Sequence, residues 1–131
     1  RRRFNWHFDN ELKQVSIKNE NGRPHSFSIQ EIQHILVQLL AEFGDQYFPL
    51  ANNVVRLANR TERRGLGMII REQANSTVLH AQGSSYLGVV LEEAGYFQWN
   101  GVNIGIAWRI IDTDFRLPTI ESRLLQRPIR L

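Results

Sequence analysis

Arginines cluster in one short stretch of the sequence, and their chemistry is that of phosphate binding. Arg56, Arg60 and Arg63 recur every three to four residues, so on a continuous helix their side chains share one face. The planar guanidinium group presents its N–H donors in a fixed fork that matches a phosphate. Arg64 lies beside them, and Glu62 is the acidic residue within the cluster. The cluster predicts a phosphate-binding surface, with a solvated face held by salt bridges as the alternative.

The charge composition gives this surface limited support. The chain of 131 residues has a formal net charge of +3, and the three arginines at its start account for all of it. Only Lys13 and Lys18 are lysines, and the other fourteen basic residues are arginine. Arginine is favoured where planar contact with phosphate or a guanine edge matters. A compositional bias of the source genome would give the same excess.

Histidines and hydroxyls are the residues that would allow catalysis. His80 lies a few residues before Ser84 and Ser85, which suggests a base and a nucleophile, but nearness in sequence does not establish a triad. None of the four histidines has a metal-ligand spacing with another histidine, and there is no cysteine. A small hydrolase or nuclease would need His80 or His34 to meet a carboxylate in a cleft. We therefore expect no catalytic, metal or cofactor site, and keep this class as the least favoured alternative.

The strongest predicted helix spans residues 29–43. Ser28 and Glu31 fit a capping box, in which each side chain bonds a free N–H of the first turn. Apolar residues then keep one stripe for about four turns, as in a helix with one face in the core. Gly44 ends the helix.

Two further helices would carry the arginine cluster. The first spans residues 50–59, with Pro49 at its first position, where a missing N–H is tolerated. The second extends through residues 66–72, with Thr61 as its candidate cap. The residues of the first helix expected to face the core are Val54, Leu57 and Ala58.

Residues 84–111 predict a helix that leads directly into a β-hairpin. Ser84 or Ser85 is the candidate N-cap, and Gly95 is expected to end the helix in a left-handed conformation. Asn100 and Gly101 accept the positive φ angles of a type I′ turn, which predicts a two-residue hairpin turn. The buried helix face is expected to contain Leu87, Val90, Leu91 and Ala94. One face of the return strand is expected to contain Ile104, Ile106, Trp108 and Ile110.

The two ends of the chain differ in pattern. Alternation of apolar residues over residues 4–18 predicts an N-terminal strand pair. Residues 112–131 lack a sustained period, which predicts an irregular tail or a short helix near residues 120–125. We expect one α+β domain over residues 1–111, with three or four helices and a C-terminal hairpin. No apolar run approaches the roughly 18 residues of a membrane span, and the missing cysteines fit a reducing compartment, so we expect a cytoplasmic protein without a membrane partner.

A helix–turn–helix over residues 66–94 followed by a hairpin over residues 96–111 resembles the winged-helix superfamily of DNA-binding proteins. The resemblance covers about a third of the chain and is one of pattern. It implies that the helix beginning near residue 84 enters the major groove of DNA. Glu92 and Glu93 depart from this pattern because they would repel phosphate. The contacts implied for the helix start and the wing are those of Gln82, Ser84, Ser85, Tyr86 and Arg109.

The sequence therefore predicts a non-catalytic domain that binds double-stranded DNA, as a regulator of transcription or as the DNA-reading module of a larger protein. The missing initiator methionine fits such a module. Phosphate contact by Arg56, Arg60, Arg63 and Arg64 would dominate the affinity. The alternative is a protein-interaction domain that uses the hairpin and the arginine-rich tail.

Overall fold

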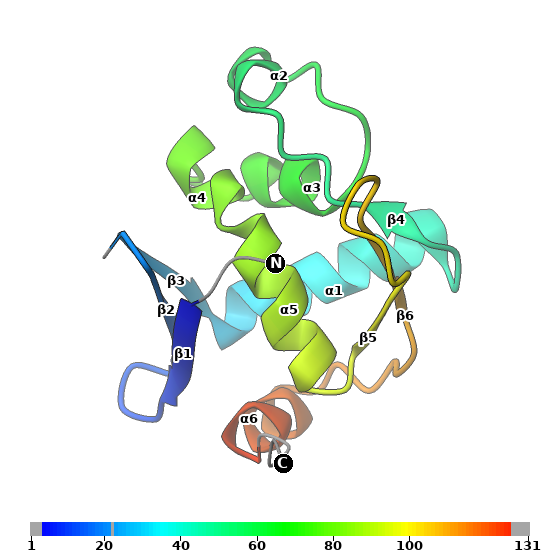
Figure 1. Cartoon of the computed structure of the whole chain (residues 1–131). Coiled ribbons are helices and arrows are strands. Elements are labelled where there is room, and N and C mark those ends of the chain that lie inside the picture. The colour runs from blue at the N-terminus through cyan, green and yellow to red at the C-terminus, as the bar shows by residue number, and fades with distance from the viewer. Residues whose placement is uncertain (1–3, 22, 127–131) are drawn as a thin grey trace.

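The computed structural model describes residues 4–21 and 23–126, and within them the chain forms six helices and two three-stranded antiparallel sheets (Figure 1). This arrangement confirms the α+β class, although it contains more helices than the sequence predicts. The three arginines at residues 1–3 lie outside the described residues, as does the end of the predicted tail, residues 127–131. The elements are β1 (Phe4–Asp9), β2 (Gln14–Asn19), β3 (Pro24–Ser28), α1 (Ile29–Phe43), β4 (Phe48–Pro49), α2 (Val54–Asn59), α3 (Leu66–Glu72), α4 (Val78–Gln82), α5 (Ser84–Glu93), β5 (Phe97–Trp99), β6 (Ala107–Ile110) and α6 (Leu117–Leu125).

The N-terminal segment forms a sheet of order β1-β2-β3, one strand more than the predicted pair. Trp6 pairs with Ile17, and Val15 pairs with Phe27. These side chains are buried on one face of the sheet. The third strand is short, and its last residue, Ser28, is also the capping residue of α1, so no separate alternating run marks it in the sequence.

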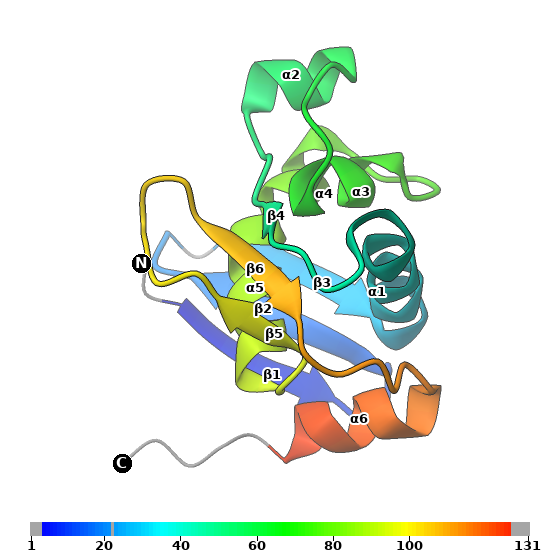
Figure 2. The ribbon, with the colours of Figure 1, turned by 90° about the vertical axis from the view of Figure 1, so that its right-hand side faces the viewer.

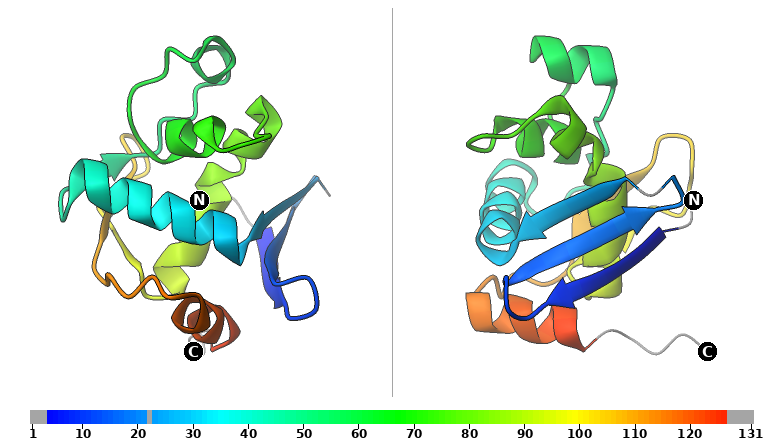
Figure 3. Two further views of the ribbon diagram at one scale, coloured as in Figure 1. Left: turned by 180° about the vertical axis from the view of Figure 1, so that it is seen from behind. Right: turned by 90° about the vertical axis from the view of Figure 1, so that its left-hand side faces the viewer.

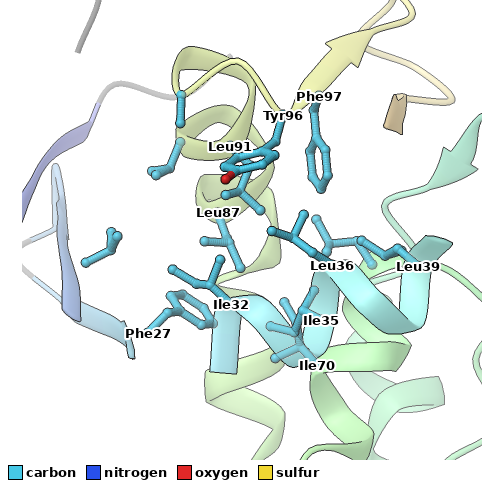
Figure 4. Packing of buried hydrophobic residues seen from close by; sticks show 14 of the residues in the cluster. Phe27, Ile32, Ile35, Leu36, Leu39, Ile70, Leu87, Leu91, Tyr96 and Phe97 are labelled. Carbon is cyan, nitrogen blue, oxygen red and sulfur yellow. The ribbon is translucent and has the colours of Figure 1, made fainter. Parts of the chain in front are cut away.

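The helix α1 confirms the predicted span and both of its ends, but the described residues form only the Ser28 half of the capping box, because the Glu31 carboxylate bonds His80. The Oγ atom of Ser28 accepts a hydrogen bond of 3.1 Å from the N–H of Glu31. At the other end, Gly44 has a φ of 57°, and its N–H donates to the carbonyl of Leu40 at 2.9 Å. The apolar stripe of α1 meets α3, α5 and the hairpin in the core (Figure 4), where the buried residues of α1 are Ile29, Ile32, Ile35, Leu36 and Leu39.

The helix predicted over residues 50–59 is shorter, and Pro49 is not its first residue. Pro49 belongs to β4, and α2 begins at Val54 after Asn53, whose side-chain oxygen accepts from the N–H of Arg56 at 3.1 Å. Residues 49–51 instead lie against the start of α3, where the N–H of Gly67 donates to the carbonyl of Leu50 at 2.7 Å. A Cβ atom on Gly67 would lie 2.3 Å from the carbonyl oxygen of Ala51, so this approach of two backbones requires glycine.

Two details predicted for α2 and α3 are wrong. Of the three core residues predicted for α2, only Leu57 is buried, whereas Val54 and Ala58 are exposed. The helix α3 begins after Gly65, which makes no side-chain cap, and Thr61 is not its cap. Residues 49–51 pack closely against α3, which the local sequence does not show. This packing sets where α2 and α3 begin.

The helix α5 lies in the middle of the molecule and is buried on nearly all sides. Figure 3 shows the β1-β2-β3 sheet on one side of it, and Figure 4 shows Leu87 and Leu91 meeting α1 on another. All residues from Tyr86 to Leu91 are buried, well beyond the single predicted face. Neither predicted serine caps this helix: it follows Gly83, and Ser84 is buried without a hydrogen-bond partner for its Oγ among the described residues. Gly95, with a φ of 86°, follows the end of α5 as predicted.

The C-terminal hairpin is present, but its turn is longer than predicted. Trp99 of β5 pairs with Trp108 of β6, and β4 pairs with the other edge of β6. The connection runs over residues 100–106, and Asn100 Nδ2 donates to the carbonyl of Gly105 at 3.0 Å. This side-chain bond replaces the predicted two-residue turn. Ile104 therefore lies in the loop at 96% exposure and not on the buried face of a strand.

The segment after the hairpin belongs to the same core. Within the predicted tail, α6 places Ile120 and Leu124 in the hydrophobic cluster beside α1 and β1. The hydroxyl of Tyr96 donates to the carbonyl of Asp114 at 2.8 Å, and Arg123 pairs with Asp112. In the described part of the chain, no helix combines the length and apolar character that a membrane crossing requires.

Candidate nucleic-acid interface

Most of the arginine cluster lies on a projection that we call the arginine lobe, residues 53–63. It contains α2 and the loop that follows, and Figures 1 and 2 show α2 standing away from the body of the molecule. Leu57 is fully buried and anchors the lobe. Arg71 of α3 fixes it further, because Arg71 Nε donates to the carbonyl of Leu57 at 3.2 Å and Nη1 to the carbonyl of Ser76 at 3.1 Å.

Three exposed arginines occupy the lobe, although they do not lie on one continuous helix. The helix α2 ends at Asn59, and Arg60 has a φ of 57°, which is the left-handed conformation of a helix end. The predicted shared helix face is therefore wrong, yet Arg56, Arg60 and Arg63 are all exposed within one short segment. Arg56 Nη1 is 3.9 Å from Glu62 Oε1. Within the described residues, neither Arg60 nor Arg63 forms an ion pair with a carboxylate.

Glu62 organises the lobe from inside. Its side chain is only 3% exposed. Its Oε2 accepts from the N–H of Asn53 at 2.8 Å, and its Oε1 accepts from the N–H of Arg63 at 2.8 Å. Glu62 thus ties the loop to the start of α2, and its charge is used on backbone donors more than on the arginines.

We expect Glu62→Ala to destabilise the protein by about 1–3 kcal/mol, because two backbone N–H groups lose their charged acceptor. Urea unfolding, followed by tryptophan fluorescence, would measure the change. Glu62→Gln keeps a side-chain oxygen for one of the bonds and should lose less. Equal losses in the two variants would contradict the role of the carboxylate.

Arg64 and Arg109 are held elsewhere. Arg64 bridges two helices: Nη2 lies 2.5 Å from Glu42 Oε1 of α1, and Nη1 lies 2.7 Å from Glu72 Oε2 of α3. The hydrogen bonds to Glu72 and Glu42 raise the pKa of Arg64. The hydrogen bond from Arg64 lowers the pKa of Glu42. Arg109 Nε donates to Gln98 Oε1 at 2.5 Å, and its guanidinium lies over the ring of Tyr47. Arg64 thus follows the salt-bridge alternative, and Arg109 is not in contact with the lobe.

The residues predicted to read bases at the start of α5 divide into two groups. Ser84 is fully buried and Tyr86 is 6% exposed. These buried side chains cannot enter a DNA groove, and the N-terminal sheet covers Tyr86, since the rings of Phe4 and Tyr86 have centroids 5.0 Å apart. Gln82 and Ser85 are half-buried and reach a pocket beside the arginine lobe.

The structure places His80 beside a carboxylate, which is one requirement of the hydrolase alternative. His80 Nε2 lies 2.7 Å from Glu31 Oε2, and both residues line a pocket with His34. No serine or threonine side chain in the described residues bonds to the His80 ring, and its other neighbour is the ring of Phe27, with centroids 4.6 Å apart. The pair lacks the bond from nucleophile to base that acyl transfer uses. Among the same residues, no group of three or more His, Asp or Glu is arranged to hold a metal ion.

We expect His25, beside this pair, to make the free energy of unfolding depend on pH. Burial lowers the pKa of His25, and the charges of His80 and Arg23 lower it further. The folded state therefore binds fewer protons at His25 than the unfolded state, and the free energy of unfolding should decrease as the pH falls below about 6.5. Urea unfolding at pH 7.5 and 5.5 would test this. The free energy of unfolding should decrease less in His25→Gln than in the wild type, and as much as in the wild type in His34→Gln, which changes an exposed histidine. An equal decrease in all three proteins would assign the pH effect to other groups.

No protein-family model matches this chain, and neither a curated protein nor a solved structure shows significant similarity to it.

Proposed function

We propose that this protein is a nucleic-acid-binding domain that holds the phosphate backbone, of double-stranded DNA first, with the arginine lobe. The observation that carries the proposal is the exposure of Arg56, Arg60 and Arg63 on one projection, two of them without a carboxylate partner among the described residues. Guanidinium groups without an internal partner are free to release the counterions of a polyanion. Arg64 and Arg109 are not part of this surface.

The proposed mode of contact uses projections and not an inserted helix. Two projections support it: the arginine lobe and the β5–β6 loop, residues 100–106, which Figure 2 shows at the top and at the upper left of the molecule. The order of helices followed by a hairpin is compatible with a winged-helix arrangement. The burial of α5 argues against a groove-reading role for most of that helix. Backbone contact of this kind positions a protein on DNA without specifying sequence.

The test is binding of the full chain to a labelled duplex of mixed sequence, titrated with salt. We expect the logarithm of the affinity to fall linearly with the logarithm of the salt concentration, with a slope of roughly −2 to −3 for two or three phosphates. Fluorescence anisotropy would measure it. Absence of binding at low salt would overturn the proposal.

A protein partner is the second candidate, because apolar side chains are exposed on both projections. Val54 and Val55 of the lobe are 49% and 66% exposed, and Val102 and Ile104 of the loop are 47% and 96% exposed. Exposed apolar groups that gather in one region mark interaction sites. A complex with a protein whose affinity does not change with salt would favour this candidate over contact with phosphate.

A further inference from the structure

A pocket of about 490 Å³ lies beside the arginine lobe, between α2, the start of α5 and the β5–β6 loop. Val54, the first residue of α2, forms part of its wall, so the pocket adjoins the helix that carries Arg56. Its volume is within the range of pockets that bind small molecules. None of the described residues that line it is charged.

The polar side chains of this pocket have unused hydrogen-bonding capacity. Three amides, Asn52, Gln82 and Asn103, and the hydroxyl of Ser85 line it. None of these side chains forms a hydrogen bond within the described residues, whereas Asn53 and Asn100 nearby do. Each amide offers both a donor and an acceptor. The pocket therefore suits a ligand that presents donors and acceptors side by side and carries no charge.

Two aromatic rings supply part of the apolar lining of the pocket, and aliphatic side chains supply the rest: Leu50, Val54, Val89 and Ile106. Phe4 and Tyr86 both line it, with an edge-to-face contact at an interplanar angle of 64°. The Tyr86 hydroxyl also has no hydrogen-bond partner among the described residues. Aromatic side chains beside amides are the combination that stacks on and reads an unpaired base in nucleic acids.

We infer that this pocket binds a nucleobase. The inference rests on the proposed function, because a strand held by the arginine lobe would present a base beside its phosphates. The amides would bond the edge of the base, as Asn and Gln bond adenine, and the aromatic rings would contact its face. A base can enter only when it is unpaired, which distinguishes this mode from the reading of an intact duplex.

The experiment compares three labelled DNAs with one sequence: a paired duplex, the duplex with one unpaired adenine, and the duplex with an abasic nucleotide in place of that adenine. We expect the unpaired adenine to bind roughly tenfold more tightly than the abasic DNA, since stacking on an aromatic residue contributes about that factor per base. Adenosine alone, followed by amide chemical shifts, tests whether the pocket also takes a free nucleoside.

The variant Asn52→Ala/Gln82→Ala, which changes two amides of the pocket outside both projections, should remove most of the preference for the unpaired adenine while leaving binding to the paired duplex unchanged. The matched control is Gln30→Ala/Gln46→Ala, which removes two exposed amides that do not line the pocket. If the duplex with the unpaired adenine and the abasic duplex bind equally, and the paired duplex still binds, the pocket does not bind a base and the proposed function stands. Shifts with adenosine but no binding of any DNA would support the pocket and overturn the proposed function. Failure to bind any DNA or adenosine would overturn both.

Discussion

The double charge reversal Arg60→Glu/Arg63→Glu is expected to lower the affinity for duplex DNA by roughly two orders of magnitude at about 0.15 M salt. Each arginine would lose a phosphate contact, and each new carboxylate would repel the backbone. The slope of the salt titration should become less negative by about two, since two counterions fewer are released. Thermal unfolding should stay nearly unchanged, because both side chains are exposed and form no ion pair in the described structure.

The matched control for this variant is Lys13→Glu/Arg116→Glu, which changes the net charge by the same amount. Lys13 lies between β1 and β2 and Arg116 directly before α6, and Figures 1 and 2 show α6 at the end of the molecule opposite α2. Their partners, Glu121 and Asp114, are at the surface, where an ion pair contributes little to stability. If both double variants weaken binding equally, net charge and not the arginine lobe attracts DNA.

Trp108→Ala is expected to destabilise the fold by about 3–5 kcal/mol, the largest single effect on stability that we predict. Trp108 is fully buried in β6, at the centre of the β4-β6-β5 sheet. Its indole ring fills the space left by Gly88 of α5, where a Cβ atom would lie 2.5 Å from the ring. Truncation to alanine would leave a cavity between the hairpin and the central helix, because neither backbone can move into it. Urea unfolding measures the loss.

Trp99→Ala is the control, since Trp99 is the residue paired with Trp108 on β5 but is only half-buried. Its loss should be clearly smaller, even though its Nε1 donates to the carbonyl of Val102 at 3.1 Å. Similar losses would show that the hairpin, and not its contact with α5, sets the cost. The double variant Gly88→Ala/Trp108→Phe should lose less than the sum of the single changes, because a smaller ring leaves room for the methyl group.

Local chemistry was sufficient to predict several elements. Ser28 and Gly44 mark the two ends of α1, because capping depends on bonds between residues three or four apart. The alternation around Trp6 predicted the first two strands, and the change of period near Gly95 predicted where α5 gives way to β5. In each case the residues that form the structure are neighbours in the chain.

The tertiary structure decided which charged and polar groups remain available. Arg64 resembles Arg60 and Arg63 in the sequence, but Glu42, 22 residues away, occupies it in the fold. Ser84 and Tyr86 carry the residue types of a helix start that contacts DNA, yet both are buried in the fold, Tyr86 against Phe4 of the N-terminal sheet. The half-buried Gln82 faces a pocket that only the approach of α2 and the β5–β6 loop creates. The sequence by itself determined the elements and the presence of an arginine cluster, because these depend on local spacing; the usable site depended on contacts between residues far apart in the chain, which local spacing does not encode.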